Sequence, residues 1–152
     1  MKGGAGNTVI RNKKASHEFE FIEKFIAGIV LTGTEIKSIR EGKATIGDSY
    51  CQFSNGELFI KGMHISEYWW GNINNHEPLR ERKLLLTRRE LKKLDRKVRE
   101  TGLTVIPIKI FITERGLAKA EIALSRGKKE YDKRETLKRK DAVREMDRSR
   151  KK

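Results

Sequence analysis

The sequence predicts a mainly β protein, built as an OB-fold-like small antiparallel β-barrel with short helices and a basic, intrinsically disordered C-terminal tail. Three observations favour this fold class. About six short segments have the composition or alternation of strands, one longer segment has the pattern of a helix, and no βαβ unit repeats along the chain. A chain of 152 residues is long enough for one such domain with a modest core.

Changes in composition predict the domain boundaries. Residues 1–15, rich in glycine and basic side chains, are expected to form a flexible arm, and residues 16–126 the barrel. Residues 127–152 contain few apolar side chains, too few to hold a helix on a core, so we expect this tail to be disordered in isolation. Two Glu–Arg pairs spaced i, i+4 would support a helix there on a phosphate-rich surface.

The first half of the barrel is predicted to contain strands, a short helix and a hairpin. Residues 18–21 alternate polar and apolar side chains, as a half-buried strand does, and residues 27–31 form a second apolar strand. A short helix is expected over 34–40. Within 48–62, two strands flank Asn55-Gly56, a pair that supplies the positive φ angles of a tight turn.

The clearest helix begins after Thr87, which forms a T-x-x-E capping box with Glu90. One face of this helix is apolar, the rest is basic, and Gly102 ends it. The β-branched stretch 103–113 follows, with Pro107 predicting an edge or a bulge, and residues 118–124 alternate as a last strand.

The positive charge is concentrated in two blocks. The formal net charge is +14, and residues 80–101 and 128–152 each contribute +6 of it. Such concentration favours a polyanionic partner, because neutralising phosphates releases condensed counterions. No apolar run approaches the roughly 20 residues of a membrane span. The single cysteine, Cys51, fits a reducing cytoplasm and is interpreted as a small buried apolar residue.

The sequence favours binding over catalysis. His17, His64 and His76 are scattered without metal-ligand spacing, and neither a P-loop nor a nucleophile elbow is present. We therefore expect no catalytic residue, no metal and no cofactor. The run Tyr68-Trp69-Trp70 could stack on bases, but packing in the core or a loop is the favoured interpretation.

Several collinear segments resemble the small protein B family, also called the SsrA-binding proteins. The most distinctive is Gly33 to Ala44, with the sequence GTEIKSIREGKA. The others, in order along the chain, are Asn12 to Phe19, Ala27 to Leu31, Asp48 to Tyr50, Arg82 to Leu86 and Gly127 to Arg134.

The resemblance implies an OB-like barrel that binds the tRNA-like domain of transfer-messenger RNA (tmRNA) and delivers it to stalled ribosomes. It further implies that the tail enters the empty mRNA channel, becomes helical and meets small-subunit rRNA at the decoding centre. Incomplete proteins would then be tagged for degradation. The protein itself would be a monomer and would catalyse nothing.

The resemblance also assigns roles to particular residues. Asn12, Leu85 and Lys119 match positions at the tmRNA surface, whereas Ile26 stands where the family often has a glutamate. Charge and position in the matching segments extend the predicted RNA-binding set to Lys13, Lys14, Lys37 and Lys83. Arg88 and Arg89 join the set because they lie on the basic surface of the predicted helix. The predicted ribosome-interacting residues of the tail are Gly127, Lys128, Lys129, Tyr131, Asp132, Lys133 and Arg134.

Two other functions are compatible with the residues. A structural ribosomal protein would share a small barrel and a basic tail, and it would co-purify stoichiometrically with every ribosome. An RNA-processing nuclease would cleave labelled RNA in the presence of Mg²⁺.

Overall fold

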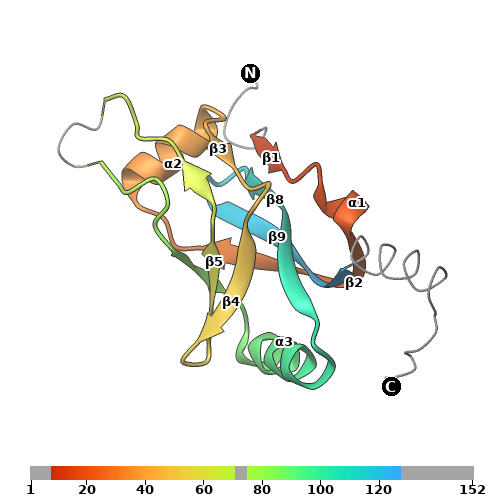
Figure 1. Cartoon of the computed structure of the whole chain (residues 1–152). Helices are drawn as coiled ribbons and strands as arrows, with labels where there is room; N and C mark the ends of the chain where they lie inside the picture. Colours follow the sequence, from red (N-terminus) through yellow and green to blue (C-terminus); the bar gives the residue numbers. More distant parts are fainter. Residues whose placement is uncertain (1–7, 71–74, 128–152) are drawn as a thin grey trace.

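A closed antiparallel sheet forms the body of the protein (Figure 1). The computed structural model describes residues 8–70 and 75–127. The sheet has seven strands in the order β1-β8-β4-β5-β7-β2-β9, and a further pairing of β8 with β9 closes it into a ring. These strands are β1 (Val9–Arg11), β2 (Phe19–Ile29), β4 (Tyr50–Ser54), β5 (Glu57–Lys61), β7 (Arg82–Leu85), β8 (Thr104–Ile112) and β9 (Ala118–Gly127). The mainly β prediction is therefore confirmed.

Helices lie at both ends of the ring. The helix α3 (Arg88–Thr101) lies below β4 and β8 in Figure 1, and α2 (Gly33–Arg40) lies at the opposite end. Beside α2, β3 (Ala44–Thr45) and β6 (His64–Ile65) pair as a separate two-stranded sheet. A four-residue helix, α1 (Ala15–Glu18), precedes β2.

The local signals of the second half of the chain are confirmed. Thr87 and Glu90 make the predicted capping box of α3, and Gly102 ends this helix with a φ angle of +71°. The Asn55-Gly56 turn has the positive φ angles of +53° and +79° that its sequence predicts. The register between β8 and β9 shifts directly after Pro107, as expected for a proline that cannot donate to the ladder.

Two predictions for the N-terminal part need correction. Residues 9–11, assigned to a flexible arm, form β1 and pair with β8, and Asn12 is buried beside it. The two strands predicted over 18–21 and 27–31 are one strand, β2, with an irregularity between Phe21 and Glu23. A continuous strand forms because β9 pairs with β2 along nearly all of its length.

The core lies inside the ring, and α3 covers one end of it. Leu94 of α3 is fully buried, with Leu91 and Val98 packed beside it. Burial of these side chains, rather than helix propensity, stabilises a helix whose other faces are charged. The fully buried apolar side chains include Ile39, Ile46, Leu58, Ile60, Leu84, Ile110 and Ile122.

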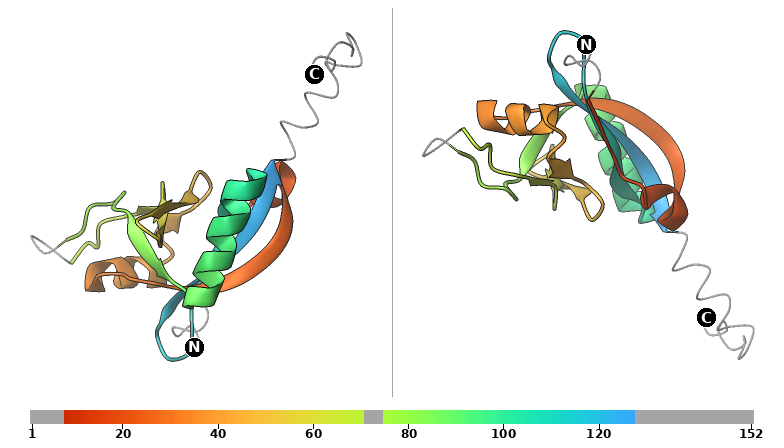
Figure 2. Two further views of the ribbon diagram at one scale, coloured as in Figure 1. Left: turned by 90° about the horizontal axis from the view of Figure 1, so that it is seen from below. Right: turned by 90° about the horizontal axis from the view of Figure 1, so that it is seen from above.

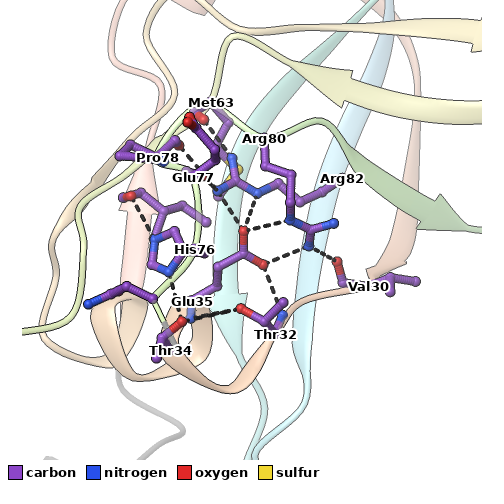
Figure 3. A network of polar contacts seen from close by, with 12 residues as sticks. Val30, Thr32, Thr34, Glu35, Met63, His76, Glu77, Pro78, Arg80 and Arg82 are labelled. Carbon is purple, nitrogen blue, oxygen red and sulfur yellow. Dashed lines mark hydrogen bonds and ion pairs between the residues drawn. The ribbon is translucent and has the colours of Figure 1, made fainter. Parts of the chain in front are cut away.

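A buried ion pair joins α2 to β7 (Figure 3). The side chains of Glu35 and Arg82 are both fully buried. Arg82 Nε donates to Glu35 Oε2 at 2.8 Å, and Arg80 Nη2 donates to Oε1 at 2.8 Å. The carboxylate also accepts from the Thr32 backbone N–H, which caps α2. Glu35 thus has the hydrogen bonds that a buried carboxylate requires.

The same network positions the segment that connects β6 to β7. Arg82 Nη1 donates to the Met63 carbonyl at 2.7 Å, and Arg82 Nη2 donates to the carbonyls of Glu77 and Pro78. His76 lies between the Thr34 hydroxyl and the Ile65 carbonyl, each at 2.9 Å. Because a carbonyl can only accept, Nε2 of His76 donates to Ile65, and Nδ1 shares a hydrogen bond with the Thr34 hydroxyl.

The charged partners keep Glu35 ionised. Burial alone would raise the pKa of this carboxyl group. The hydrogen bonds from Arg80, the Thr32 backbone and Arg82 outweigh that effect and lower the pKa from 4.5 to about 2.

Replacing Glu35 should destabilise the fold strongly. Glu35→Gln leaves the fully buried Arg82 without its counter-charge, a change that typically costs about 3–5 kcal/mol in the free energy of unfolding. Urea denaturation followed by circular dichroism measures this loss. The matched control is Glu57→Gln, because Glu57 pairs with Lys83 at the surface and should contribute little. Equal effects of the two substitutions would contradict the structural role of Glu35.

Acid should remove the contribution of Glu35 in a defined pH range. Because its pKa is lower in the folded protein, its stabilisation is present above about pH 4.5 and is lost as the pH falls towards about 2. The full contribution corresponds to about 3 kcal/mol. Urea unfolding across this pH range should therefore show a smaller pH dependence for Glu35→Gln than for the parent chain. If the substitution leaves the pH dependence of unfolding unchanged, titration of Glu35 is not the cause of the acid destabilisation.

Candidate nucleic-acid interface

Three predicted RNA-binding residues lie close together on the outside of the ring. Lys83 and Leu85 belong to β7 and Lys119 belongs to β9, with β2 between these strands. Gly28 of β2 pairs with Leu85 of β7 on one side and with Lys119 of β9 on the other. Lys83 lies two residues before Leu85 on the same outward face. Residues so distant in the sequence come together only because β2 lies between β7 and β9.

Exposed apolar side chains surround this glycine. In β2, Phe25, Ala27 and Ile29 are buried, so the alternating positions point outwards. Ile26 is 51% exposed, Val30 44% and Leu85 51%. We call Ile26, Gly28, Val30, Lys83, Leu85 and Lys119 the outer sheet face. Contiguous exposed apolar groups beside lysines are typical of an interface.

Gly28 leaves the centre of the outer sheet face open. A Cβ atom at this position would lie 3.5 Å from the Leu85 Cβ, in ordinary van der Waals contact. The glycine therefore does not relieve a clash, and a side chain there would instead cover the surface between Leu85 and Lys119. Lys119 is half-buried and forms no ion pair with any described residue, so its charge is available to a partner.

Asn12 does not belong to the outer sheet face. It is only 8% exposed, and its Nδ2 donates to the Pro107 carbonyl at 3.0 Å. Its Oδ1 is buried without a hydrogen-bond partner in the described structure. Lys13 beside it is exposed, while Lys14 pairs with Asp48 at 3.1 Å, which raises the pKa of Lys14 through that hydrogen bond. An RNA contact at this corner stays a prediction.

Lys37 lies on α2, at the end of the ring opposite α3. Its Nζ is 5.6 Å from the centre of the Tyr68 ring, a cation–π contact. Trp69 and Trp70, expected to pack in the core or a loop, are 78% and 70% exposed and touch each other edge to face. The packing interpretation of these two tryptophans is wrong, because the segment that carries them extends away from the core.

The exposed side of α3 carries a basic stripe. Arg88, Arg89, Lys92 and Arg96 are exposed and form no ion pair with any described residue. Other cations of the helix are paired, Lys93 with Glu23 at 2.7 Å and Arg99 with Asp95 at 3.0 Å. The stripe extends over two turns, which suits contact with successive phosphates.

The remaining predicted residues lie elsewhere or outside the described part. Gly127 is the last residue of β9 and is exposed. The other tail positions, from Lys128 to Arg134, lie outside the described residues. The candidate interface therefore does not include the 25 residues 128–152.

The described residues contain no candidate metal site. No group of three or more His, Cys, Asp and Glu side chains among them could hold a metal ion. Cys51 is buried, as predicted, and burial raises the pKa of its thiol. None of the described helices is long and apolar enough to cross a membrane.

The sequence reasoning missed the apolar part of the outer sheet face. The sequence identified Ile26 only as a departure from the family pattern and did not identify Val30 as a surface residue. The alternation Phe25 to Val30 carried the signal, because every second residue of a strand with one buried face points outwards. Recognising this alternation required knowledge that Phe19–Ile29 is a single strand.

Known proteins resemble this chain over most of its length. The family model for the SmpB protein matches residues 9–152. The SsrA-binding protein of Phocaeicola vulgatus is 59% identical over 139 residues, which cover 91% of this chain and 93% of the relative. That of Cytophaga hutchinsonii is 59% identical over 144 residues, covering 95% and 94%.

A solved structure has the same fold. It is described as "tmRNA-SmpB: a journey to the center of the bacterial ribosome", and it matches with a TM-score of 0.67 and 45% sequence identity. The match covers 80% of this chain and 85% of the solved one. On these grounds, the chain is a member of the SmpB protein family.

Proposed function

We propose that this protein is a tmRNA-binding adaptor of trans-translation, which binds the tRNA-like domain of tmRNA and delivers it to stalled ribosomes. The observation that carries the proposal is the convergence of Lys83, Leu85 and Lys119 around Gly28 on the outer sheet face. Relatives named SsrA-binding proteins and a solved tmRNA–SmpB structure support it. The ring is proposed to act as an OB-type RNA-binding barrel in the bacterial cytoplasm, as a monomer and without catalysis.

The outer sheet face suits a folded RNA better than a free strand. It offers an open glycine, three exposed aliphatic side chains and only two lysines. Aliphatic groups pack against riboses and exposed bases, while Lys119 contacts a phosphate. Lys83 pairs with Glu57 at 2.7 Å and would have to exchange this partner for a phosphate. Such a surface recognises the shape of an RNA elbow rather than a base sequence.

Phosphates elsewhere are proposed to lie on the basic stripe of α3 and on the tail. The tail, residues 127–152, would enter the empty mRNA channel and contact small-subunit rRNA at the decoding centre. Residues 128–152 carry twelve basic and six acidic side chains, a composition suited to a channel lined by RNA phosphates. This division assigns tmRNA binding to the barrel and ribosome probing to the tail.

Charge reversal on the outer sheet face should weaken binding of the isolated tRNA-like RNA. Lys119→Glu replaces a phosphate contact by repulsion and should lower the affinity by about tenfold or more. Leu85→Asp should act similarly by placing a charge among aliphatic contacts. The control is Lys43→Glu, which makes the same change of charge on an exposed loop away from this face. Gel-shift titration measures the affinities, and equal losses in Lys119→Glu and Lys43→Glu would refute the assignment.

Removal of the tail should separate the two proposed activities. Deleting residues 131–152 should leave binding of the tRNA-like RNA largely intact and abolish tagging of proteins on stalled ribosomes. A reconstituted translation reaction on an mRNA without a stop codon measures tagging, and a gel shift measures RNA binding. Loss of RNA binding on truncation would contradict the proposed division of labour.

A further inference from the structure

A groove runs along α3 on the side that faces the β4–β5 hairpin. Its first part has a volume of about 570 Å³ and is lined by Gly56, Leu86, Arg88, Leu91, Lys92 and Asp95. Its second part, about 340 Å³, is lined mainly by Tyr50 to Phe53, Asp95, Val98, Thr104 and Val105. Asp95 lines both parts, so they adjoin at this residue. Both volumes fall in the range of roughly 300–1,000 Å³ usual for small-molecule sites.

The first part of the groove has an apolar floor and a cationic rim. Leu86 and Leu91 form the floor and are only partly buried, although both pack against the core. Arg88 and Lys92 stand on the rim, and neither forms an ion pair with a described residue. They are four residues apart on α3, hence about 6 Å apart along the helix axis. Two cations without ion-pair partners among the described residues, above an apolar floor, suit an anion attached to a flat apolar group.

Asp95 adds a directional feature. Its carboxylate accepts two hydrogen bonds from Arg99, at 3.0 and 3.2 Å. A carboxylate has about four acceptor positions, so two remain for a ligand. A phosphate would be repelled by Asp95, whereas an exocyclic amino group of a base could donate to it. The ligand should therefore lie with its anion at Arg88 and Lys92 and with an amino donor at Asp95.

We propose that this groove binds one unpaired RNA nucleotide whose base carries an exocyclic amino group. The phosphate lies on Arg88 and Lys92, the base packs on Leu86 and Leu91, and its amino group donates to Asp95. The site deepens the proposed function, since it requires only that the protein meets RNA. No residue that lines the groove belongs to the outer sheet face, although Leu86 follows Leu85 directly.

An acidic peptide is the competing occupant of such a groove. Its carboxylates would satisfy Arg88 and Lys92, and its apolar side chains would fit the floor. The peptide would, however, place further carboxylates near Asp95, whereas the nucleotide places a neutral amino donor there. The charge arrangement therefore favours the nucleotide.

The first test compares two RNA probes on the full-length parent protein. Fluorescein-labelled hexacytidylate offers amino donors and hexauridylate offers none, while both carry the same phosphates. Fluorescence anisotropy at physiological salt should show the cytidine probe binding about tenfold more tightly, the effect of one hydrogen bond to a charged acceptor. In Asp95→Ala the two affinities should become equal. Equal affinities in the parent protein, or an unchanged ratio in Asp95→Ala, would overturn the proposal.

The second test uses two substitutions matched in charge. Lys92→Glu and Arg96→Glu both reverse one exposed cation of α3 that forms no ion pair with a described residue, but of the two only Lys92 lines the groove. Hexacytidylate affinity should fall several-fold more in Lys92→Glu, and ultraviolet crosslinks should map to residues 86–98. Equal losses, or displacement of the probe by an acidic leucine-containing peptide at matched charge, would refute a nucleotide site.

A third measurement separates this site from the outer sheet face. Lys119→Glu should keep the preference for cytidine while losing affinity for the tRNA-like RNA. Loss of the cytidine preference in this variant would contradict the separation of the two sites. If the parent protein binds the tRNA-like RNA but shows no preference for hexacytidylate over hexauridylate, the nucleotide site in the groove is refuted and the proposed function is not.

Discussion

Closure of the sheet through β8 and β9 is the constraint on which the other features depend. Once β9 pairs with both β2 and β8, β2 is held between β7 and β9 in a fixed register. That register places Gly28 opposite both Leu85 and Lys119, and the outer sheet face follows. Closure also leaves an open end, across which α3 lies (Figure 2). The apolar side of α3 packs on the core there, and its exposed cations lie on the other side. A ring without free edges further protects most strands from unwanted pairing.

The buried Glu35–Arg82 pair has a different role, since it orders a segment that has little apolar core of its own. Arg82 belongs to β7, yet its guanidinium donates to carbonyls at Met63, Glu77 and Pro78. An aliphatic residue could fill the same volume but could not satisfy those carbonyls. The pair is therefore better explained by the conformational specificity that it gives to the β6–β7 connection than by net stability.

Local signals predicted those parts of the fold that depend on neighbouring residues. The caps of α3, the Asn55-Gly56 turn and the irregularity after Pro107 each need only a few adjacent residues, and each was predicted. Features that depend on distant pairing were not predictable in this way. Residues 9–11 look like an arm until β8 is available to pair with them. The exposure of Trp69 and Trp70 likewise has no signal in the adjacent residues. Of the site, the residue types were predictable, whereas their division among separate surfaces required the closed ring.

That division determines how each surface can contribute to RNA binding. The outer sheet face carries few charges and several aliphatic groups, so its contribution depends mainly on shape and should change less with salt than that of the basic stripe. The basic stripe of α3 carries four exposed cations without described ion-pair partners, and a contact of that kind weakens steeply as salt rises. On a single surface, added cations would increase electrostatic attachment but would leave less room for the aliphatic groups that recognise shape. Because these surfaces lie on different elements, shape recognition of a folded RNA and electrostatic attachment to phosphates can act at the same time.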